Sequence, residues 1–139
     1  MLALSKVLYT AKVDFRGSHD ASMARSSDGR LNIAFTPLGA DGEGTNSEQL
    51  LAASWSACYD GAIRAAARKR KIKLPQAMAI SAEVDLTLFA GLYKFQVRLN
   101  VSMPGMARFL AQELLDEAHE TCPLSVATRG NVGVVARLT

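Results

Sequence analysis

Cysteine, aromatic residues and long hydrophobic runs are all scarce in this chain of 139 residues. It contains two cysteines, and aromatic residues make up only 6% of its composition. Two cysteines cannot build the framework of several disulfides that holds many small secreted proteins together. No apolar stretch approaches the roughly 18 residues that a transmembrane helix needs. The sequence therefore predicts no membrane-spanning helix, and its alanines and branched aliphatic residues must fill the core.

The first residues, MLALSKVLYTAKVDF, are apolar but do not have the pattern of a signal peptide. A lysine stands at position 6, and no small-residue cleavage site follows. We expect this segment to form the first strand and the protein to be cytoplasmic. A purely structural disulfide is unusual in that compartment. The two cysteines are then either idle buried thiols or groups with redox or metal chemistry.

The rest of the composition predicts one globular domain over residues 1–139. Apolar residues make up 49% and charged residues 21%, and a net charge of +3 does not by itself indicate nucleic acid. Apolar and polar residues alternate in several segments, which is the pattern of half-buried strands. These segments are residues 7–15, 31–35, 80–88, 93–101 and 132–138, and a further short strand is considered at residues 23–26.

A first helix is expected to open at Thr45 and to run toward Lys71. Glu48 stands three places after Thr45, as in a capping box. Residues 50–67 are apolar on nearly every side, which is typical of a helix that is buried all round. A single domain of this size has difficulty covering such a helix, so the pattern favours a dimer.

A second helix is expected to begin near Pro104 and must end before Pro123. Its predicted apolar stripe contains Met106, Phe109, Leu110, Leu114 and Ala118. The order of elements is then β-β-α-β-β-α-β, an α+β fold.

The two cysteines fall at different places in this order. Cys58 lies in the middle of the first helix, where apolar surroundings raise the pKa of a thiol and favour an idle group. Cys122, beside Pro123, is expected in a loop and therefore more accessible. Spacing alone does not bring the two together. A zinc site with His19 and His119 matches no known ligand spacing, so we expect neither a metal nor another cofactor.

Two segments carry a resemblance to a known family. GTNSEQLLAASWSACYDGAI, which contains Cys58, and CPLSVATRGNV, which contains Cys122, closely resemble the two signature segments of the organic hydroperoxide resistance (Ohr) proteins of the OsmC/Ohr superfamily. The likeness extends to KVLYTA, SSDGRL, KRKIKLP and MPGM, and so to nearly the whole chain. It implies an OsmC/Ohr-like fold, with antiparallel sheets around two central buried helices in an intertwined homodimer.

The resemblance also implies a reaction and a role for each cysteine. Cys58 would be the peroxidatic cysteine, which reduces an organic hydroperoxide to an alcohol and becomes a sulfenic acid. Cys122 would be the resolving cysteine, which forms a disulfide with Cys58. The reductant of this family is typically a lipoyl dithiol on a lipoylated protein. Apolar surroundings of Cys58 would suit an alkyl or fatty-acid hydroperoxide better than hydrogen peroxide.

The family's thiolate-activating residues are matched only in part. Glu48 matches the family's glutamate, but Gly17-Ser18-His19-Asp20-Ala21 stands where an arginine-containing loop is expected. Arg16 or Arg25 could supply the cation from a shifted register, or His19 could supply it as a part-time cation. Otherwise the activity is weakened or altered.

The distance along the first helix adds a constraint. Ten residues of straight helix separate Glu48 from Cys58 by about 15 Å. A chain of contacts from glutamate to cation to thiolate then needs either a helix break around residues 54–56 or residues from both subunits.

Three other features have competing interpretations. Trp55, one turn before Cys58, could line the substrate pocket or pack in the core. Basic residues crowd the end of the first helix, as a solvated end or as a docking patch for an acidic partner. Arg129 is expected to anchor the loop that carries Cys122. The alternative function is that of a binding or redox-sensing protein on the same scaffold, with weak or no peroxidase turnover.

Overall fold

The computed structural model describes residues 5–18 and 21–139, and the chain forms two compact units, Met1–Asn46 and Ser47–Thr139. The first unit contains β1 (Val13–Gly17), β2 (Ser22–Ser26) and β3 (Asn32–Phe35). The second contains α1 (Ser47–Lys69), β4 (Ala79–Phe89), β5 (Leu92–Ser102), α2 (Arg108–Thr121), α3 (Pro123–Thr128) and β6 (Gly133–Leu138). The α+β class predicted from the sequence is confirmed.

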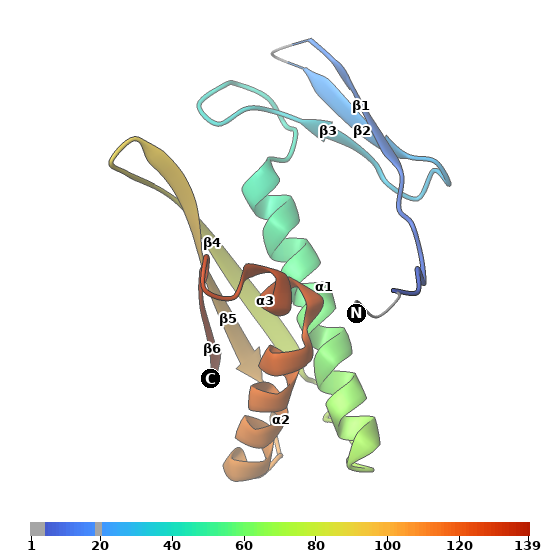
Figure 1. The fold of residues 1–139 in the computed structure, drawn as a ribbon, viewed down its shortest axis with the longest axis vertical. Coiled ribbons are helices and arrows are strands. Elements are labelled where there is room, and N and C mark those ends of the chain that lie inside the picture. The colour runs from blue at the N-terminus through green and yellow to red at the C-terminus, as the bar shows by residue number, and fades with distance from the viewer. Residues whose placement is uncertain (1–4, 19–20) are drawn as a thin grey trace. The chain divides into compact units, whose positions relative to one another are not determined.

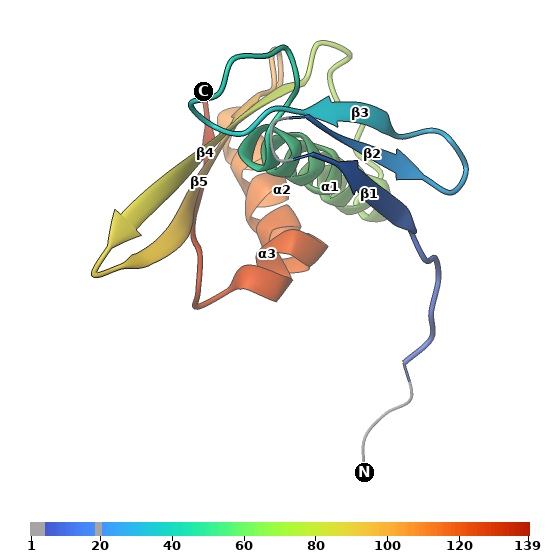
Figure 2. The same cartoon turned by 90° about the horizontal axis from the view of Figure 1, so that it is seen from above.

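The first unit is a three-stranded antiparallel sheet in the order β1-β2-β3 (Figure 2). The short strand considered at residues 23–26 is present as β2. The first strand was expected over residues 7–15 but begins at Val13, and Val7, Leu8 and Tyr9 are exposed. Alternation alone does not make a strand, because its backbone groups also need a neighbouring strand.

The second unit contains a three-stranded sheet in the order β4-β5-β6. Strands β4 and β5 occupy the two segments that the alternation predicts and pair with Ala82 opposite Leu99, and residues 90–91 form the turn between them. The prediction of antiparallel sheets is wrong for β6, which runs parallel to β5. The helices between these strands form the long crossover connection that a parallel pair requires.

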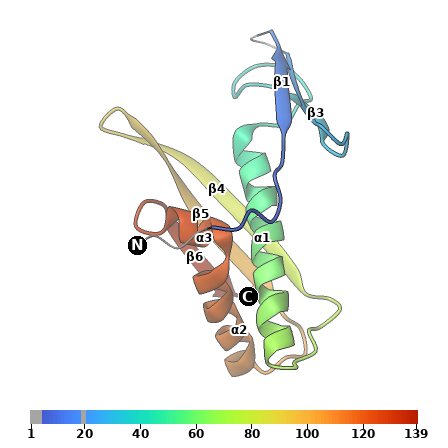
Figure 3. The same cartoon turned by 45° about the vertical axis from the view of Figure 1, so that its right-hand side comes forward.

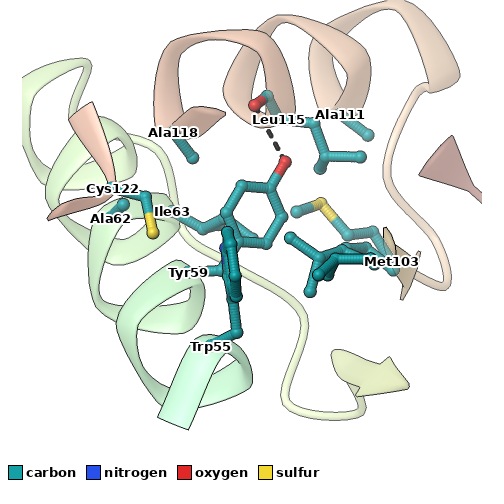
Figure 4. Close-up of a cluster of buried hydrophobic side chains, with 12 residues drawn as sticks. Trp55, Tyr59, Ala62, Ile63, Met103, Ala111, Leu115, Ala118 and Cys122 are labelled. Carbon is teal, nitrogen blue, oxygen red and sulfur yellow. Dashed lines mark hydrogen bonds between the residues drawn. The ribbon is translucent and has the colours of Figure 1, made fainter. Parts of the chain in front are cut away.

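Helices α1 and α2 lie side by side on one face of this sheet (Figures 1 and 3). The core cluster contains Trp55, Tyr59 and Ile63 from α1 and Leu115 from α2 (Figure 4). Leu99 of β5 belongs to the same cluster. The buried residues of α2 are Ala111, Leu114, Leu115 and Ala118. Phe109, predicted to belong to the apolar stripe, is 78% exposed. It stands two residues before Ala111, which places it about 200° around the helix axis from the buried side.

Helix α1 begins at Ser47, two residues later than predicted, because Thr45 is held in a bridge with Phe35. The prediction that this helix is buried on all sides is wrong for the single chain. One side is buried, but small residues spaced four apart form an exposed stripe along another side. These residues are Ala53, Ala57, Gly61 and Ala65.

Helix α3 was not predicted. Pro123 was interpreted as a stop for the preceding helix, whereas it is the first residue of a new one. Proline suits that position because its fixed φ is helical and its missing N–H has no partner there in any case. Six residues are too few to show a helical period in the sequence.

Candidate functional site

The two sulfur atoms lie in contact within the second unit. The Cys122 Sγ–H donates to Cys58 Sγ over 3.3 Å, although the residues are 64 positions apart. Both are free thiols. Cys58 is presented from the middle of α1 and Cys122 from the single residue between α2 and α3. Because the sulfurs of a disulfide are about 2.05 Å apart, a small movement would bring the pair to bonding distance.

The burial of the two thiols is the reverse of what the sequence suggested. Cys122 was expected to be accessible in a loop, but it is 0% exposed and belongs to the core cluster. Cys58 was expected to be buried, but it is partly exposed. The reason is α3, which follows Cys122 at once and folds it inward. A reagent from solvent therefore reaches Cys58 before Cys122.

The surroundings of Cys58 act on its ionisation in opposite directions. Burial raises the pKa of the Cys58 thiol, and the neighbouring Cys122 raises it further. The backbone N–H of Leu124, which hydrogen bonds the Cys58 sulfur, lowers that pKa but does not cancel the increase. This N–H lies in the first turn of α3, where amide groups have no partner within the helix. Among the described residues of the second unit, no cation contributes to the Cys58 pKa.

Glu48 lies in the first turn of α1, on the same helix as Cys58. The helix is continuous between them, and Ser56 Oγ–H donates to the Ala52 carbonyl over 2.8 Å without interrupting it. The alternative with a helix break around residues 54–56 is therefore wrong. The separation stays at about 15 Å, and the alternative with residues from two subunits remains a prediction.

The candidate cations belong to the first unit. Arg16 and Arg25 line one hollow of about 250 Å³ with Asp14 and Met23, on the sheet face opposite Phe15. Arg25 Nε–H donates to Asn32 Oδ1 over 3.4 Å. His19 lies outside the described residues. The structure thus brings Arg16 and Arg25 together, and the choice among the three cations stays a prediction.

Trp55 is 1% exposed and packs in the core of the second unit, and its role in a substrate pocket stays a prediction. Its Nε1–H donates to Ser125 Oγ over 3.4 Å, and Ser125 is itself 1% exposed. Tyr59, one turn further along α1, donates its hydroxyl to the Leu115 carbonyl over 2.9 Å (Figure 4). Ser125 was missed by the sequence interpretation, although it stands in the quoted CPLSVATRGNV segment.

Arg129 anchors the segment that follows Cys122. Its guanidinium donates to the carbonyl oxygens of His119 (3.2 Å) and Glu120 (3.5 Å), at the C-terminal end of α2. Cations are favourable there because the last carbonyls of a helix lack partners. The predicted anchoring role is confirmed.

Arg70, one of the basic residues at the end of the first helix, has a structural role. Arg70 donates to Glu113 over 2.9 Å and to Glu117 over 3.0 Å, and so ties the end of α1 to α2. Within residues 5–18 and 21–139, no group of three or more His, Cys, Asp or Glu side chains is arranged to hold a metal ion. No helix of the described chain is long and apolar enough to cross a membrane.

Several known proteins that resemble this chain in sequence and fold are organic hydroperoxide resistance proteins. Residues 40–136, which include both cysteines, match the family of OsmC-like proteins. The organic hydroperoxide resistance protein of Xanthomonas axonopodis pv. citri is 39% identical over 141 aligned residues, covering 99% of each chain. The crystal structure of OhrB of Bacillus subtilis has a TM-score of 0.87 at 39% identity and covers 96% of this chain and 100% of its own. An organic hydroperoxide resistance protein from Elizabethkingia anophelis gives a TM-score of 0.88 at 32% identity, with coverages of 97% and 99%.

The fold and the site define an α+β protein with two free thiols held in contact. The chain belongs to the OsmC-like family, within its branch of organic hydroperoxide resistance proteins. The family membership that the two cysteine segments indicated is confirmed.

Proposed function

We propose that the protein is a cysteine-based thiol peroxidase that reduces organic hydroperoxides to alcohols. The observation that carries the proposal is the contact of 3.3 Å between the sulfurs of Cys58 and Cys122. Two thiols without a function would have no need to lie in contact. The names of the relatives, organic hydroperoxide resistance proteins, support a hydroperoxide as the substrate.

The proposed reaction has three balanced steps. The thiolate of Cys58 attacks the outer oxygen of ROOH, the O–O bond breaks, and the alkoxide takes up a proton to leave as ROH. Cys58 is then a sulfenic acid. Cys122 attacks its sulfur, the S–OH bond breaks, and water leaves as the disulfide forms. A dithiol reduces this disulfide by exchange and is itself oxidised to a cyclic disulfide.

The burial of the two thiols supports this assignment of roles. The partly exposed Cys58 can meet a hydroperoxide from solvent, whereas the fully buried Cys122 cannot. Cys122 can still reach the Cys58 sulfur, which is its immediate neighbour. Cys58 packs against the apolar core cluster of the second unit, and these apolar surroundings favour an organic hydroperoxide over hydrogen peroxide.

The proposal includes an assembly, a reductant and a location. Both units would act as one domain over residues 1–139 in a homodimer, since the exposed stripe of small residues on α1 lets another helix approach closely. The reductant would be a lipoyl-type dithiol on a protein partner, and the compartment the cytoplasm, where thiols are kept reduced.

Single-turnover oxidation tests the proposal. Reduced protein is mixed with one equivalent of cumene hydroperoxide or of hydrogen peroxide, and the loss of thiols is followed. We expect rapid loss of two thiols, a preference for the organic peroxide, and no reaction in Cys58→Ser. Thiol loss no faster than that of free cysteine would contradict it.

The raised pKa of Cys58 favours a second candidate, a redox-sensing or binding protein with little turnover. Oxidation of both thiols without recovery in the presence of dihydrolipoamide would support this candidate.

A further inference from the structure

The contact between α1 and α3 includes a buried polar pair that the proposed reaction does not use. Trp55 and Ser125 are 70 residues apart in sequence, and the indole N–H of one donates to the hydroxyl oxygen of the other. Each residue is 1% exposed, so water does not replace this partner. Buried polar groups are costly to leave unpaired, which makes such a hydrogen bond specific for one arrangement of the two helices.

The arrangement that this bond holds is the one that surrounds Cys58. Trp55 lies three residues before Cys58 on α1, and Ser125 lies three residues after Cys122. Leu124, whose backbone N–H hydrogen bonds the Cys58 sulfur, is the residue directly before Ser125. The position of Ser125 against α1 therefore determines where both the Leu124 N–H and the Cys122 sulfur lie.

Helix α3 needs such a restraint. It has only six residues, and helices of this length are not stable on their own in water. Its Ser125 hydroxyl is the side chain that fixes it to α1 through a directional bond, whereas apolar contacts alone permit sliding and rotation.

We propose that Trp55 and Ser125 are positioning residues, which orient α3 so that the backbone N–H of Leu124 donates to the thiolate of Cys58. Neither residue touches the peroxide. They act through the main chain of α3, which presents a hydrogen-bond donor to the sulfur where a negative charge develops. This role rests on the proposed function only in taking Cys58 as the attacking thiol.

The inference can be tested without a peroxide. In a Cys122→Ser background, the rate of Cys58 alkylation by iodoacetamide is measured against pH, which gives the pKa of a single thiol. Of the described titratable groups, Cys122 is the one that acts on Cys58, and the background removes it. Two neighbouring charged groups act elsewhere. Asp116 of α2 raises the pKa of Tyr59, and Arg129 donates to the carbonyls at the end of α2.

The expected effect follows from the loss of a well-placed donor. Ser125→Ala and Trp55→Phe should each raise the pKa of Cys58 by about half a unit to one unit, and so slow alkylation at pH 7 roughly three- to tenfold. The double variant should show no larger shift than either single variant, because both remove the same bond. Ser125→Thr keeps a hydroxyl and should restore most of the rate.

Tyr59→Phe is the matched control. It also removes a buried hydrogen bond from α1, one turn away, but that bond leads to α2 and not to α3. This variant should lose stability and keep the alkylation profile of its background. A Cys58 pKa that is unchanged in Ser125→Ala and in Trp55→Phe, or shifts that add in the double variant, would overturn the inference. Absence of peroxidase turnover with these pKa shifts intact would instead contradict the proposed function alone.

Discussion

The thiols of Cys58 and Cys122 are 64 residues apart in sequence, and their sulfur atoms are 3.3 Å apart in the fold. The contact joins the middle of the longest helix to the single residue that separates two others. A disulfide, with its sulfurs about 2.05 Å apart, needs only a short further approach of these two atoms.

We therefore expect one equivalent of hydroperoxide to form a disulfide within one chain. In the chain-entropy account, closing a loop of this length stabilises a protein by about 4 kcal/mol. Calorimetry should show a higher Tm for oxidised than for reduced protein, and no such difference in Cys122→Ser. A disulfide that links two chains on non-reducing gels would contradict the geometry.

Alkaline pH should destabilise the reduced protein through two groups whose pKa values are raised in the fold, Cys58 and Tyr59. Burial raises the pKa of Cys58 above its ordinary value of 9.0 and that of Tyr59 above 10.0. The native state then keeps protons that the unfolded state loses, so stability is complete below pH 9 and falls as pH rises beyond it.

Urea unfolding at a series of pH values measures this effect. Tyr59→Phe should be less stable by about 1 kcal/mol at pH 7, because a buried hydrogen bond is lost. Its decline above pH 10 should be shallower than that of the unsubstituted protein. If the free energy of unfolding falls equally with pH in both proteins, Tyr59 has the same pKa in the folded and the unfolded state.

A cation from the first unit should speed the reaction of Cys58 with hydroperoxide. Arg25 donates to Asn32, whereas among the described residues Arg16 makes no such bond, so Arg16→Ala should slow single-turnover oxidation more than Arg25→Ala. Each unit of pKa increase corresponds to about tenfold in rate at neutral pH. His19→Ala, measured in parallel, tests the remaining candidate. If all three variants react as fast as the unsubstituted protein, none of these residues of the first unit supplies the cation.

Substitution of Arg129 should slow the formation of the disulfide but not the attack of Cys58 on the peroxide. Arg129→Ala removes the donor from the last carbonyls of α2, next to Cys122. We expect a longer-lived sulfenic acid at Cys58, detectable by dimedone trapping, with an unchanged rate of peroxide consumption. Arg137→Ala, another exposed arginine of the same C-terminal segment, is the control and should behave as the unsubstituted protein.

The exposed stripe on α1 should be the dimer contact. A Cβ atom at Gly61 would meet no atom within 4 Å in the single chain, so we expect Gly61→Glu to fold as the unsubstituted chain does. Light scattering should show monomers for Gly61→Glu and dimers for Gln76→Glu, a control with the same added charge. A dimeric Gly61→Glu would place the contact elsewhere.

Much of the fold was predictable from the sequence because period and burial agree in its long elements. The two strands of 11 residues, β4 and β5, lie where alternation predicts them, and the turn at residues 90–91 sets the pairing of Ala82 with Leu99. The strand expected over residues 7–15 shows the limit. Alternation there is as regular as in β4, but pairing begins only at Val13.

The site was predictable only in its chemistry. The quoted segments identify both cysteines, but no local pattern indicates that Cys122 is more buried than Cys58. That difference depends on α3, whose six residues are too short for a period and whose Pro123 also suits a helix stop. The Trp55–Ser125 bond joins residues 70 positions apart and has no local signal at all.

The division of the chain at Asn46 separates two chemical properties. Both sulfurs belong to residues 47–139, and all three candidate cations belong to residues 1–46. The proposed assignment of the cation to the first unit implies that substitutions there change how readily Cys58 ionises, whereas the contact between the two sulfurs lies within the second unit. Sensitivity to peroxide and efficiency of thiol coupling are then free to evolve separately.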